Sequence, residues 1–494
     1  MINVLWKHRI IIFIIFLSTY AILLRFHNLS NSYIFGFDEE YYATYAWTLV
    51  SDPHPIWIGG SASFLDYYLG PYFTYFTAFL LWISRGDPLF TGYIAGIVGT
   101  ITSIAIFFVG WRFFNLTTGI AASLLYAGLP MTVFYDQKYW NPMFVPIIVL
   151  VIFTSLMLVK KSPWWWLLFT GAVGAIFNTD LAPLPLSLIG IIYFIKGKYW
   201  LNKKIVLSCT LVFLLFYWPL LVFDYNHNFS NLTVLSRYKK QVKQSGAKFD
   251  PKGKYLSFLN TMGRYWYLRE GRPNADELNI SCNSQKTSPS PWLSSLSIIL
   301  FLSFLTVSFM SKKEAYKILS YFLVVSFGFY VIYTGGAFEY YLLMFITLFT
   351  FIPAILIGHL NVKLKPFFWI LILIILALGF NTVFNSSDKF GLGAKKRLIE
   401  KVMGEVGNNN FSIEDMGVCH TYEGWRFLFK AYGKTPTKSF TDKHLAWMYP
   451  KEVKNDIITY EVFLSQWGVI PDKNMIGYTK IEEGGFSAYV KKIK

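Results

Sequence analysis

Three consecutive carboxylates, Asp38, Glu39 and Glu40, stand in the segment FDEEYYATYAW, directly after the first long apolar run of the chain. A carboxylate beside a membrane surface can act as a general base, bind a metal ion, or stabilise the amino-terminal end of a helix. Two interpretations follow. Asp38 is either a base that takes a proton from a substrate, or the cap of a helix whose first turn holds the two glutamates.

A second polar turn, YDQKYWNP, joins two apolar runs and is unusually rich in polar groups for a connector. In one interpretation Gln137 and Lys138 hold a phosphate, while Asp136 assists a base or binds a cation. In the other, the Asn-Pro pair starts the next helix, and the lysine and the tryptophan anchor the chain at the membrane interface. The sequence supports both equally.

Further candidate groups lie between later apolar runs. The segment RYWYLREGRP places Arg264 and Arg269 among aromatic residues, and such cations are suited to neutralising an anionic head group. The segment FEYYLLMF places Tyr340 and Tyr341 at a helix end, which is also typical of an interfacial aromatic belt. Asp180, in the turn NTD, is one more acid, and a helix cap would explain it.

The composition decides the class of protein that presents these groups. The 494 residues are 54% hydrophobic and only 15% charged, and the mean hydropathy is +0.42. These values indicate an integral membrane protein. The net charge of +17 does not indicate nucleic-acid binding, because much of the Lys and Arg excess lies in short loops, where it orients helices. The three cysteines show no metal-ligand spacing and no disulfide framework.

Apolar runs of about 20 residues can each cross the roughly 30 Å of bilayer hydrocarbon as a helix. Twelve candidates begin near residues 10, 69, 90, 118, 143, 164, 181, 205, 293, 318, 341 and 366. Basic clusters should mark cytoplasmic ends, and all of them face inward only if the run with Gly70 and Pro71 does not cross. Eleven crossings are then expected. The predicted fold is an all-α polytopic membrane protein with about 11 to 13 transmembrane helices.

The same parity places the amino terminus in the cytoplasm and the acidic triplet on the outer face. After residue 385 the pattern changes: AKKRLIEKVMGEV predicts an amphipathic helix, and YTKIEEGGFSAYVKKI predicts two strands around Gly484 and Gly485. We therefore expect a transmembrane domain over residues 1–385, with outer loops at 26–68 and 224–291. A small extracytoplasmic α+β domain should follow over residues 386–494.

The order of these motifs resembles that of the GT-C type membrane glycosyltransferases, which use polyprenyl-phosphate sugars: bacterial glycosyltransferase family 39, protein O-mannosyltransferases and lipid A aminoarabinose transferases. FDEEYY is similar to the Asp-Glu motif of the first outer loop in that family, YLGPYFTYF to its proline-containing segment, YDQKYWNP to its Asn-Pro turn and FEYYLLMF to its late Tyr-rich helix. The resemblance implies a GT-C fold in the cytoplasmic membrane. It also implies transfer of a sugar from a polyprenyl-phosphate-linked donor to a lipid, glycan or protein acceptor.

The resemblance assigns the role of catalytic base to Asp38, with Glu39 beside it. The groups that it implies for binding the donor phosphate and the substrate are Lys138, Gln137, Asp136, Arg264, Arg269, Tyr340 and Tyr341. Family members that use a lipid monophosphate need no metal cofactor, while Asp38 and Asp136 leave a divalent cation open. Bacterial members often carry Arg where this chain has Gln137 and Lys138, and many carry His where it has Asp180.

Other functions fit the same composition. A transporter or flippase of lipid-linked saccharides would also need an anion site, but transporters tend to place ionisable groups near the bilayer midplane. A polymerase would share the lipid-linked donor and differ in its product. The expected partners are therefore the donor lipid, an acceptor and the bilayer, without nucleic acid.

Overall fold

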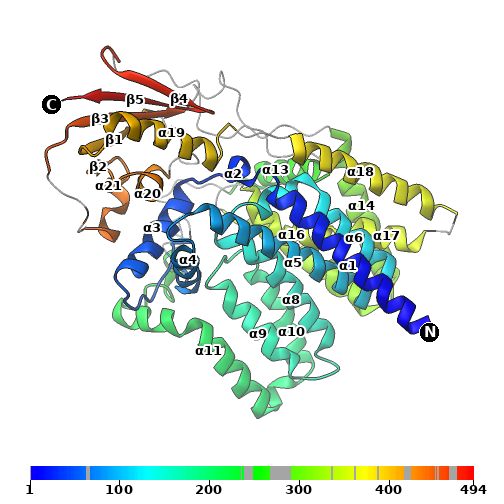
Figure 1. The fold of residues 1–494 in the computed structure, drawn as a ribbon. Coiled ribbons are helices and arrows are strands. Elements are labelled where there is room, and N and C mark those ends of the chain that lie inside the picture. The colour runs from blue at the N-terminus through cyan, green and yellow to red at the C-terminus, as the bar shows by residue number, and fades with distance from the viewer. Residues whose placement is uncertain are drawn as a thin grey trace.

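The computed structural model consists of a long helical bundle with a small α+β unit at one end (Figure 1). It describes residues 2–62, 67–234, 236–238, 249–266, 291–334, 338–360, 363–385, 389–416, 424–450, 452, 456–466 and 475–493. Arg269, Cys282 and Cys419 lie outside the described residues.

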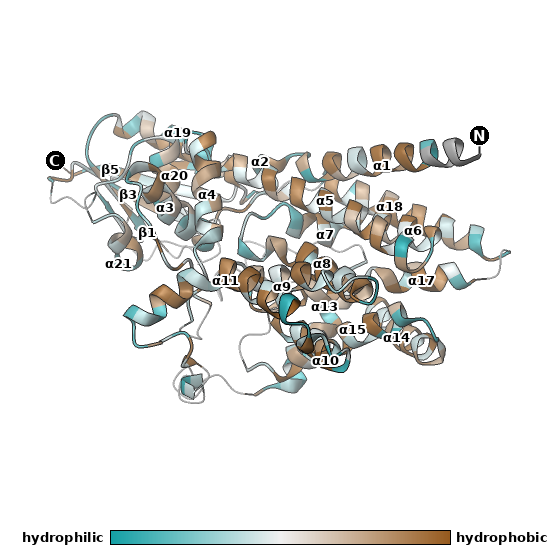
Figure 2. Cartoon of the chain, turned by 90° about the horizontal axis from the view of Figure 1, so that it is seen from below, coloured by the Kyte–Doolittle hydropathy of each residue, from teal (hydrophilic) through white to brown (hydrophobic). Residues whose placement is uncertain are grey.

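Within the described residues, eight helical segments are long and apolar enough to cross a membrane. They are α1 (Ile2–Phe26), α5 (Leu89–Phe113), the 3-10 turn Asn141–Phe144 with α8 (Val145–Leu158), α11 (Lys203–Asn226), α14 (Pro291–Met310), α15 (Glu314–Ile332), the 3-10 turn Glu339–Leu342 with α16 (Leu343–Phe349) and α17 (Phe351–His359), and α18 (Lys365–Asn385). Figure 2 shows that these helices are predominantly hydrophobic. The chain is an integral membrane protein.

One further span is broken. Helices α6 (Leu116–Gly128) and α7 (Pro130–Asp136) meet at 67°. The break falls at Leu129, before a proline that has no N–H to continue the hydrogen-bond ladder. The bend brings the polar turn after α7 close to the first helix.

Three shorter apolar helices occupy other positions where runs were predicted: α4 (Tyr72–Ile83), α9 (Trp165–Ile176) and the 3-10 turn Leu184–Leu186 with α10 (Ser187–Lys196). Helix α4 has 12 residues, about 18 Å of helix, and this is too short to cross a bilayer. That length agrees with the expectation that this run does not cross, but α9, where a crossing was predicted, also has only 12 residues. By length alone the described residues hold eight spans, or nine with the bent pair, so the eleven crossings stay a prediction.

The more polar helices are short: α2 (Leu29–Ser32), α3 (Phe37–Ser51), the 3-10 turn Tyr199–Leu201 and α13 (Pro251–Arg264). Helix α3 begins after Gly36 and carries the acidic triplet in its first turn, where negative charge is favoured by the helix dipole. Helix α13 begins at Pro251, and the side chain of Asp250 accepts a hydrogen bond from the Gly253 N–H.

The carboxy-terminal unit is a five-stranded mixed sheet with helices. Its elements are α19 (Leu392–Val406), β1 (Phe411–Asp415), α20 (Trp425–Tyr432), β2 (Lys438–Ser439), α21 (Asp442–Leu445), the 3-10 turn Ala446–Met448, β3 (Tyr460–Gln466), β4 (Thr479–Glu483) and β5 (Phe486–Lys492). The strand order is β2-β1-β3-β5-β4, in which β1 is parallel to both of its neighbours and the other pairs are antiparallel.

The predicted amphipathic helix is present as α19, which buries Leu398, Val402 and Val406 on one face. The predicted hairpin is present as β4 and β5, and Gly484 has a φ of +60° in its turn. A side chain would strain that conformation. The predicted α+β character of this part of the chain is thus confirmed.

Candidate active site

The three acids in the first turn of α3 have different surroundings. The Asp38 side chain is exposed, whereas Glu39 and Glu40 are buried. Each buried glutamate carboxylate accepts a hydrogen bond from a backbone N–H, Glu39 from Gly36 and Glu40 from Phe427. Of the triplet, Asp38 is therefore the carboxylate that a substrate can reach.

Glu39 has two contacts that fix it. Its Oε2 accepts a hydrogen bond of 2.9 Å from the Gly36 N–H, which caps the start of α3. Its Oε1 lies 3.7 Å from the Lys138 Nζ. Burial raises the pKa of this carboxyl, and the Lys138 ammonium counteracts that effect. Glu39 thus positions both its own helix and the neighbouring lysine.

Lys138 lies in the turn between α7 and α8, which the sequence marked as dense in polar groups. Its Nζ is 4.1 Å from the centre of the Trp140 ring, a cation–π contact. The Lys138 side chain keeps 23% of its surface exposed. It is a partly exposed cation next to the helix that carries Asp38, so an anion can reach it.

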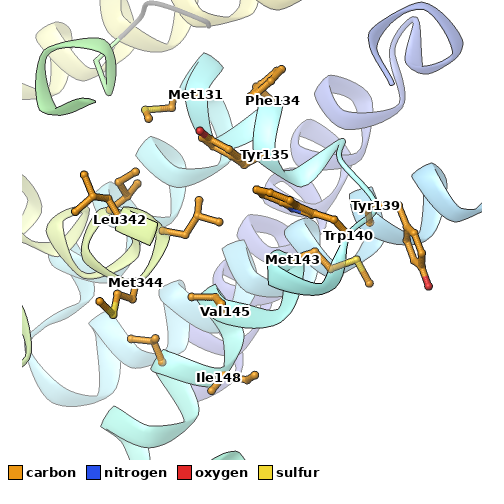
Figure 3. Packing of buried hydrophobic residues seen from close by; sticks show 14 of the residues in the cluster. Met131, Phe134, Tyr135, Tyr139, Trp140, Met143, Val145, Ile148, Leu342 and Met344 are labelled. Atoms are coloured by element: carbon orange, nitrogen blue, oxygen red, sulfur yellow. The ribbon is translucent and has the colours of Figure 1, made fainter. Parts of the chain in front are cut away.

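Aromatic side chains extend from this lysine toward the span that begins at Glu339. Ring centres are 4.9 Å apart for Trp140 and Tyr340, 4.4 Å for Tyr340 and Tyr341, and 5.5 Å for Tyr341 and Tyr333. Figure 3 shows Trp140 beside Tyr135, and their rings are stacked. We call Trp140, Tyr340, Tyr341 and Tyr333 the aromatic row. It includes both tyrosines that were predicted as site residues.

Asp180 is a second carboxylate near this row. Its Oδ1 accepts a hydrogen bond of 2.7 Å from the Ala182 N–H, and burial raises its pKa to about 6. The negative charges of Asp38 and Asp180 both raise the pKa of Tyr42, after the larger effect of burial. The fold thus brings two acids from distant parts of the sequence within electrostatic range of Tyr42.

Asp136 and Gln137 lie on the other side of the turn, against α1. Arg25 forms a buried ion pair with Asp136, at 2.6 Å from Nη2 to Oδ2, and the Tyr126 hydroxyl donates to the other carboxylate oxygen. The Gln137 amide donates to the backbone oxygens of Leu24 and Arg25. These contacts give Asp136 and Gln137 the role of holding the turn in place, on which Lys138 depends.

A second buried ion pair joins Arg264 and Glu339. Glu339 also accepts hydrogen bonds from the Tyr135 hydroxyl at 2.8 Å and from the Thr261 hydroxyl at 3.1 Å. The pair connects α13 to the start of the span Glu339–His359. Arg264 therefore positions the segment that carries Tyr340 and Tyr341, while Arg269, its predicted companion, is outside the described residues.

Lys254, on α13, was not predicted. It is buried, and its Nζ lies 5.0 Å and 5.1 Å from the ring centres of Tyr330 and Tyr333. Burial lowers its pKa to about 8. The sequence signal is its spacing, because it precedes the buried Phe258, Thr261 and Met262 by four, seven and eight residues on one helix face. Lys254 places a second cation at the far end of the aromatic row.

The carboxylates of this region are also candidate metal ligands. Across the described ranges, no three His, Cys, Asp or Glu side chains gather as ligands for an ion. Asp136, the second acid named with Asp38 as a metal ligand, is bound to Arg25 instead. The described donors therefore do not favour a cation held by this pair.

Solved structures provide the comparison. The fold is similar to ArnT from Cupriavidus metallidurans bound to undecaprenyl phosphate, with a TM-score of 0.60 at 10% identity and 98% of each chain covered. It is also similar to the oligosaccharyltransferase AglB from Archaeoglobus fulgidus in complex with an inhibitory peptide and a dolichol-phosphate, with a TM-score of 0.52 at 12% identity, covering 93% of this chain and 69% of that one. No protein-family model and no curated protein sequence matches the chain.

These likenesses define the fold class. The chain has the GT-C fold, a polytopic α-helical membrane domain with a small carboxy-terminal α+β unit. This is the architecture that the order of the sequence motifs implied, and the predicted fold is confirmed.

Proposed function

We propose that this protein is a membrane glycosyltransferase that moves a sugar from a polyprenyl-phosphate-linked donor to a lipid, glycan or protein acceptor. The observation that carries the proposal is the pairing of an exposed Asp38 with a partly exposed Lys138 across the Glu39 contact. An exposed carboxylate on α3 and a partly exposed cation held 3.7 Å from the next residue of α3 are the two kinds of group that transfer from a lipid phosphate requires. Two solved proteins of the same fold were captured with undecaprenyl phosphate and dolichol-phosphate, which supports this choice of donor.

The chemistry needs few protein groups. The acceptor O–H or N–H gives its proton to the Asp38 carboxylate while the acceptor atom attacks the anomeric carbon of the sugar. The bond between that carbon and the phosphate oxygen breaks, and its electron pair leaves with the polyprenyl phosphate. Lys138 stabilises the negative charge on the departing phosphate. Attack from the side opposite the phosphate would invert the anomeric centre.

The place of the site agrees with an enzyme better than with a transporter. Its groups stand at helix ends: the first turn of α3, the turn after α7, the turn after α9 and the start of the span at Glu339. Ionisable groups of transporters tend to lie near the bilayer midplane. The basic clusters further favour a cytoplasmic amino terminus, with this site and the carboxy-terminal unit on the outer face of the cytoplasmic membrane.

The test is release of polyprenyl phosphate by the purified protein in lipid, given a panel of polyprenyl-phosphate sugars and cell-envelope extract. We expect Asp38→Asn to lower turnover by about 10² to 10⁴-fold, with unchanged thermal unfolding. The matched control is Asp52→Asn, because Asp52 is an exposed acid at the opposite end of α3. Sugar crossing sealed vesicles without release would instead make the protein a transporter.

A further inference from the structure

The third acid of the triplet, Glu40, connects the membrane domain to the carboxy-terminal unit. Glu40 is 0% exposed, and its Oε1 accepts a hydrogen bond of 3.0 Å from the Phe427 N–H, 387 residues away. Phe427 is the third residue of α20. A helix normally satisfies this N–H with the side chain of its own preceding residue. Here that residue is Gly424, and a carboxylate from α3 takes over the role.

Gly424 permits the close approach that this cap needs. Its φ is +101°, and a Cβ at this position would lie 2.7 Å from the Phe35 carbonyl oxygen and 2.9 Å from the Gly36 carbonyl oxygen. The rings of Phe35 and Phe427 stack beside it with centres 5.9 Å apart. The start of α20 is therefore packed directly on the residues that precede Asp38.

A buried lysine of α19 forms a hydrogen bond with the same segment. Lys395 is 0% exposed, and its Nζ donates a hydrogen bond of 2.8 Å to the Phe35 carbonyl oxygen. The ammonium also lies 4.7 Å from the centre of the Trp425 ring. A buried charge is costly unless it is compensated, and the segment before Asp38 supplies part of the compensation. The Leu392 N–H adds a hydrogen bond of 2.8 Å to the Tyr33 carbonyl oxygen.

We propose that the carboxy-terminal unit is a clasp that fixes the position of Asp38, with Glu40 and Lys395 as its positioning residues. Figure 1 shows α20 against α3 and α19 near α2. The catalytic consequence rests on the proposed glycosyltransferase function. Neither residue contacts the reacting atoms. Both hold the backbone of residues 33–40, and a displacement of about 1 Å at a catalytic group can lower a rate by about 100-fold.

The test measures order and turnover separately in the full chain. Amide hydrogen exchange is followed in residues 33–51 and 424–432 of the wild type, Glu40→Ala, Glu40→Gln, Lys395→Met and Gly424→Ala. Loss of a cap should speed exchange by about fivefold in both segments, and kcat should fall about 10- to 100-fold with an unchanged KM for the donor. Glu40→Gln keeps an oxygen acceptor and should behave like the wild type. Gly424→Ala disturbs the same contact from α20, because its Cβ would collide with the Phe35 carbonyl oxygen. It provides a second test if Glu40→Ala does not fold.

The control within the unit is Glu483→Gln, which weakens two exposed ion pairs to Arg397 and Lys401 on α19 and leaves the hydrogen bonds of Glu40 and Lys395 in place. It should alter neither segment. If exchange becomes faster in residues 424–432 but is unchanged in residues 33–51, the carboxy-terminal unit does not order α3 and the proposal is wrong. An unchanged kcat in variants of an active enzyme would also contradict it. If the wild type releases no polyprenyl phosphate from any donor, the proposed function fails, while exchange in residues 33–51 still decides whether the clasp orders α3.

Discussion

The Nζ of Lys138 lies 3.7 Å from the Oε1 of Glu39, which connects the turn after α7 to the helix that carries Asp38. The contact is longer than a hydrogen bond, and the lysine keeps part of its surface exposed. Glu39 therefore balances the positive charge of Lys138, but the ammonium group can still bind another anion. The phosphate of a donor can therefore bind to Lys138, and the first prediction concerns this lysine.

Lys138→Met should lower kcat/KM for the donor by about 10- to 100-fold, the value of a hydrogen bond to a charged group. Lys138→Arg should retain more activity because it keeps the cation. Steady-state kinetics with a donor series measures both variants. The matched control is Lys160→Met, since Lys160 is an exposed lysine paired with Glu314 at 2.6 Å in a different part of the bundle. Equal losses in Lys138→Met and Lys160→Met would remove Lys138 from the donor site.

The buried pair of Arg25 and Asp136 leads to a prediction about stability. Arg25→Met leaves the Asp136 carboxylate buried without its cation, and removal of one partner of such a pair costs about 3 to 5 kcal/mol. The unfolding temperature in detergent should fall clearly. The double variant Arg25→Met/Asp136→Leu should recover most of the loss, because it leaves no unpaired charge. A single variant that unfolds at the wild-type temperature would show that the pair contributes little.

The sequence predicted the local parts of this structure well. Helix α19 and the hairpin at Gly484 are encoded within about 15 residues each, by apolar spacing and by turn glycines. The acidic start of α3 is equally local, since Gly36 and three acids mark a helix beginning. Asp38, Lys138, Tyr340 and Tyr341 also lie in short local motifs, and the resemblance of these motifs to a known family named them as candidates before the fold was known.

The contacts between distant segments could not be predicted. Nothing in the sequence around Arg25 pointed to Asp136, 111 residues away. The hydrogen bond by which Glu40 caps α20 likewise joins residues that are 387 positions apart, and nothing local predicted it. Asp180 was explained as a helix cap, and only the packing of α9 against α8 and α11 brings it to the tyrosines of the site. Such pairings depend on tertiary packing, which one sequence does not specify.

Lys254 leads to a prediction about pH. Burial lowers its pKa to about 8, so its positive charge is present below this pH and is lost above it. Lys254 lies beside Tyr333, at the end of the aromatic row. If its positive charge attracts the anionic donor, the KM for the donor should rise as the pH passes 8. Lys254→Arg keeps its charge throughout this range and should abolish the rise, whereas Lys254→Met should show a high KM at every pH. A wild-type KM that is flat from pH 6 to 9 would contradict this role.

Asp180 gives a prediction of the opposite kind, about stability below neutral pH. Its pKa is raised from 3.8 to about 6, so between these values the folded protein holds a proton that the unfolded chain releases. Stability falls with rising pH wherever the folded state binds more protons. The contribution of Asp180 should therefore decline from about pH 4 to pH 6 and stay constant above.

Asp180→Asn cannot ionise and removes that contribution. The difference in unfolding temperature between Asp180→Asn and the wild type should increase in favour of the variant from about pH 4 to pH 6 and then level off. Thermal unfolding in detergent across this range measures it, and Asp52→Asn serves as the control at an exposed acid. A difference that does not change with pH would mean that Asp180 is solvated like an ordinary surface carboxylate. Its charge would then be too well screened to act on Tyr42.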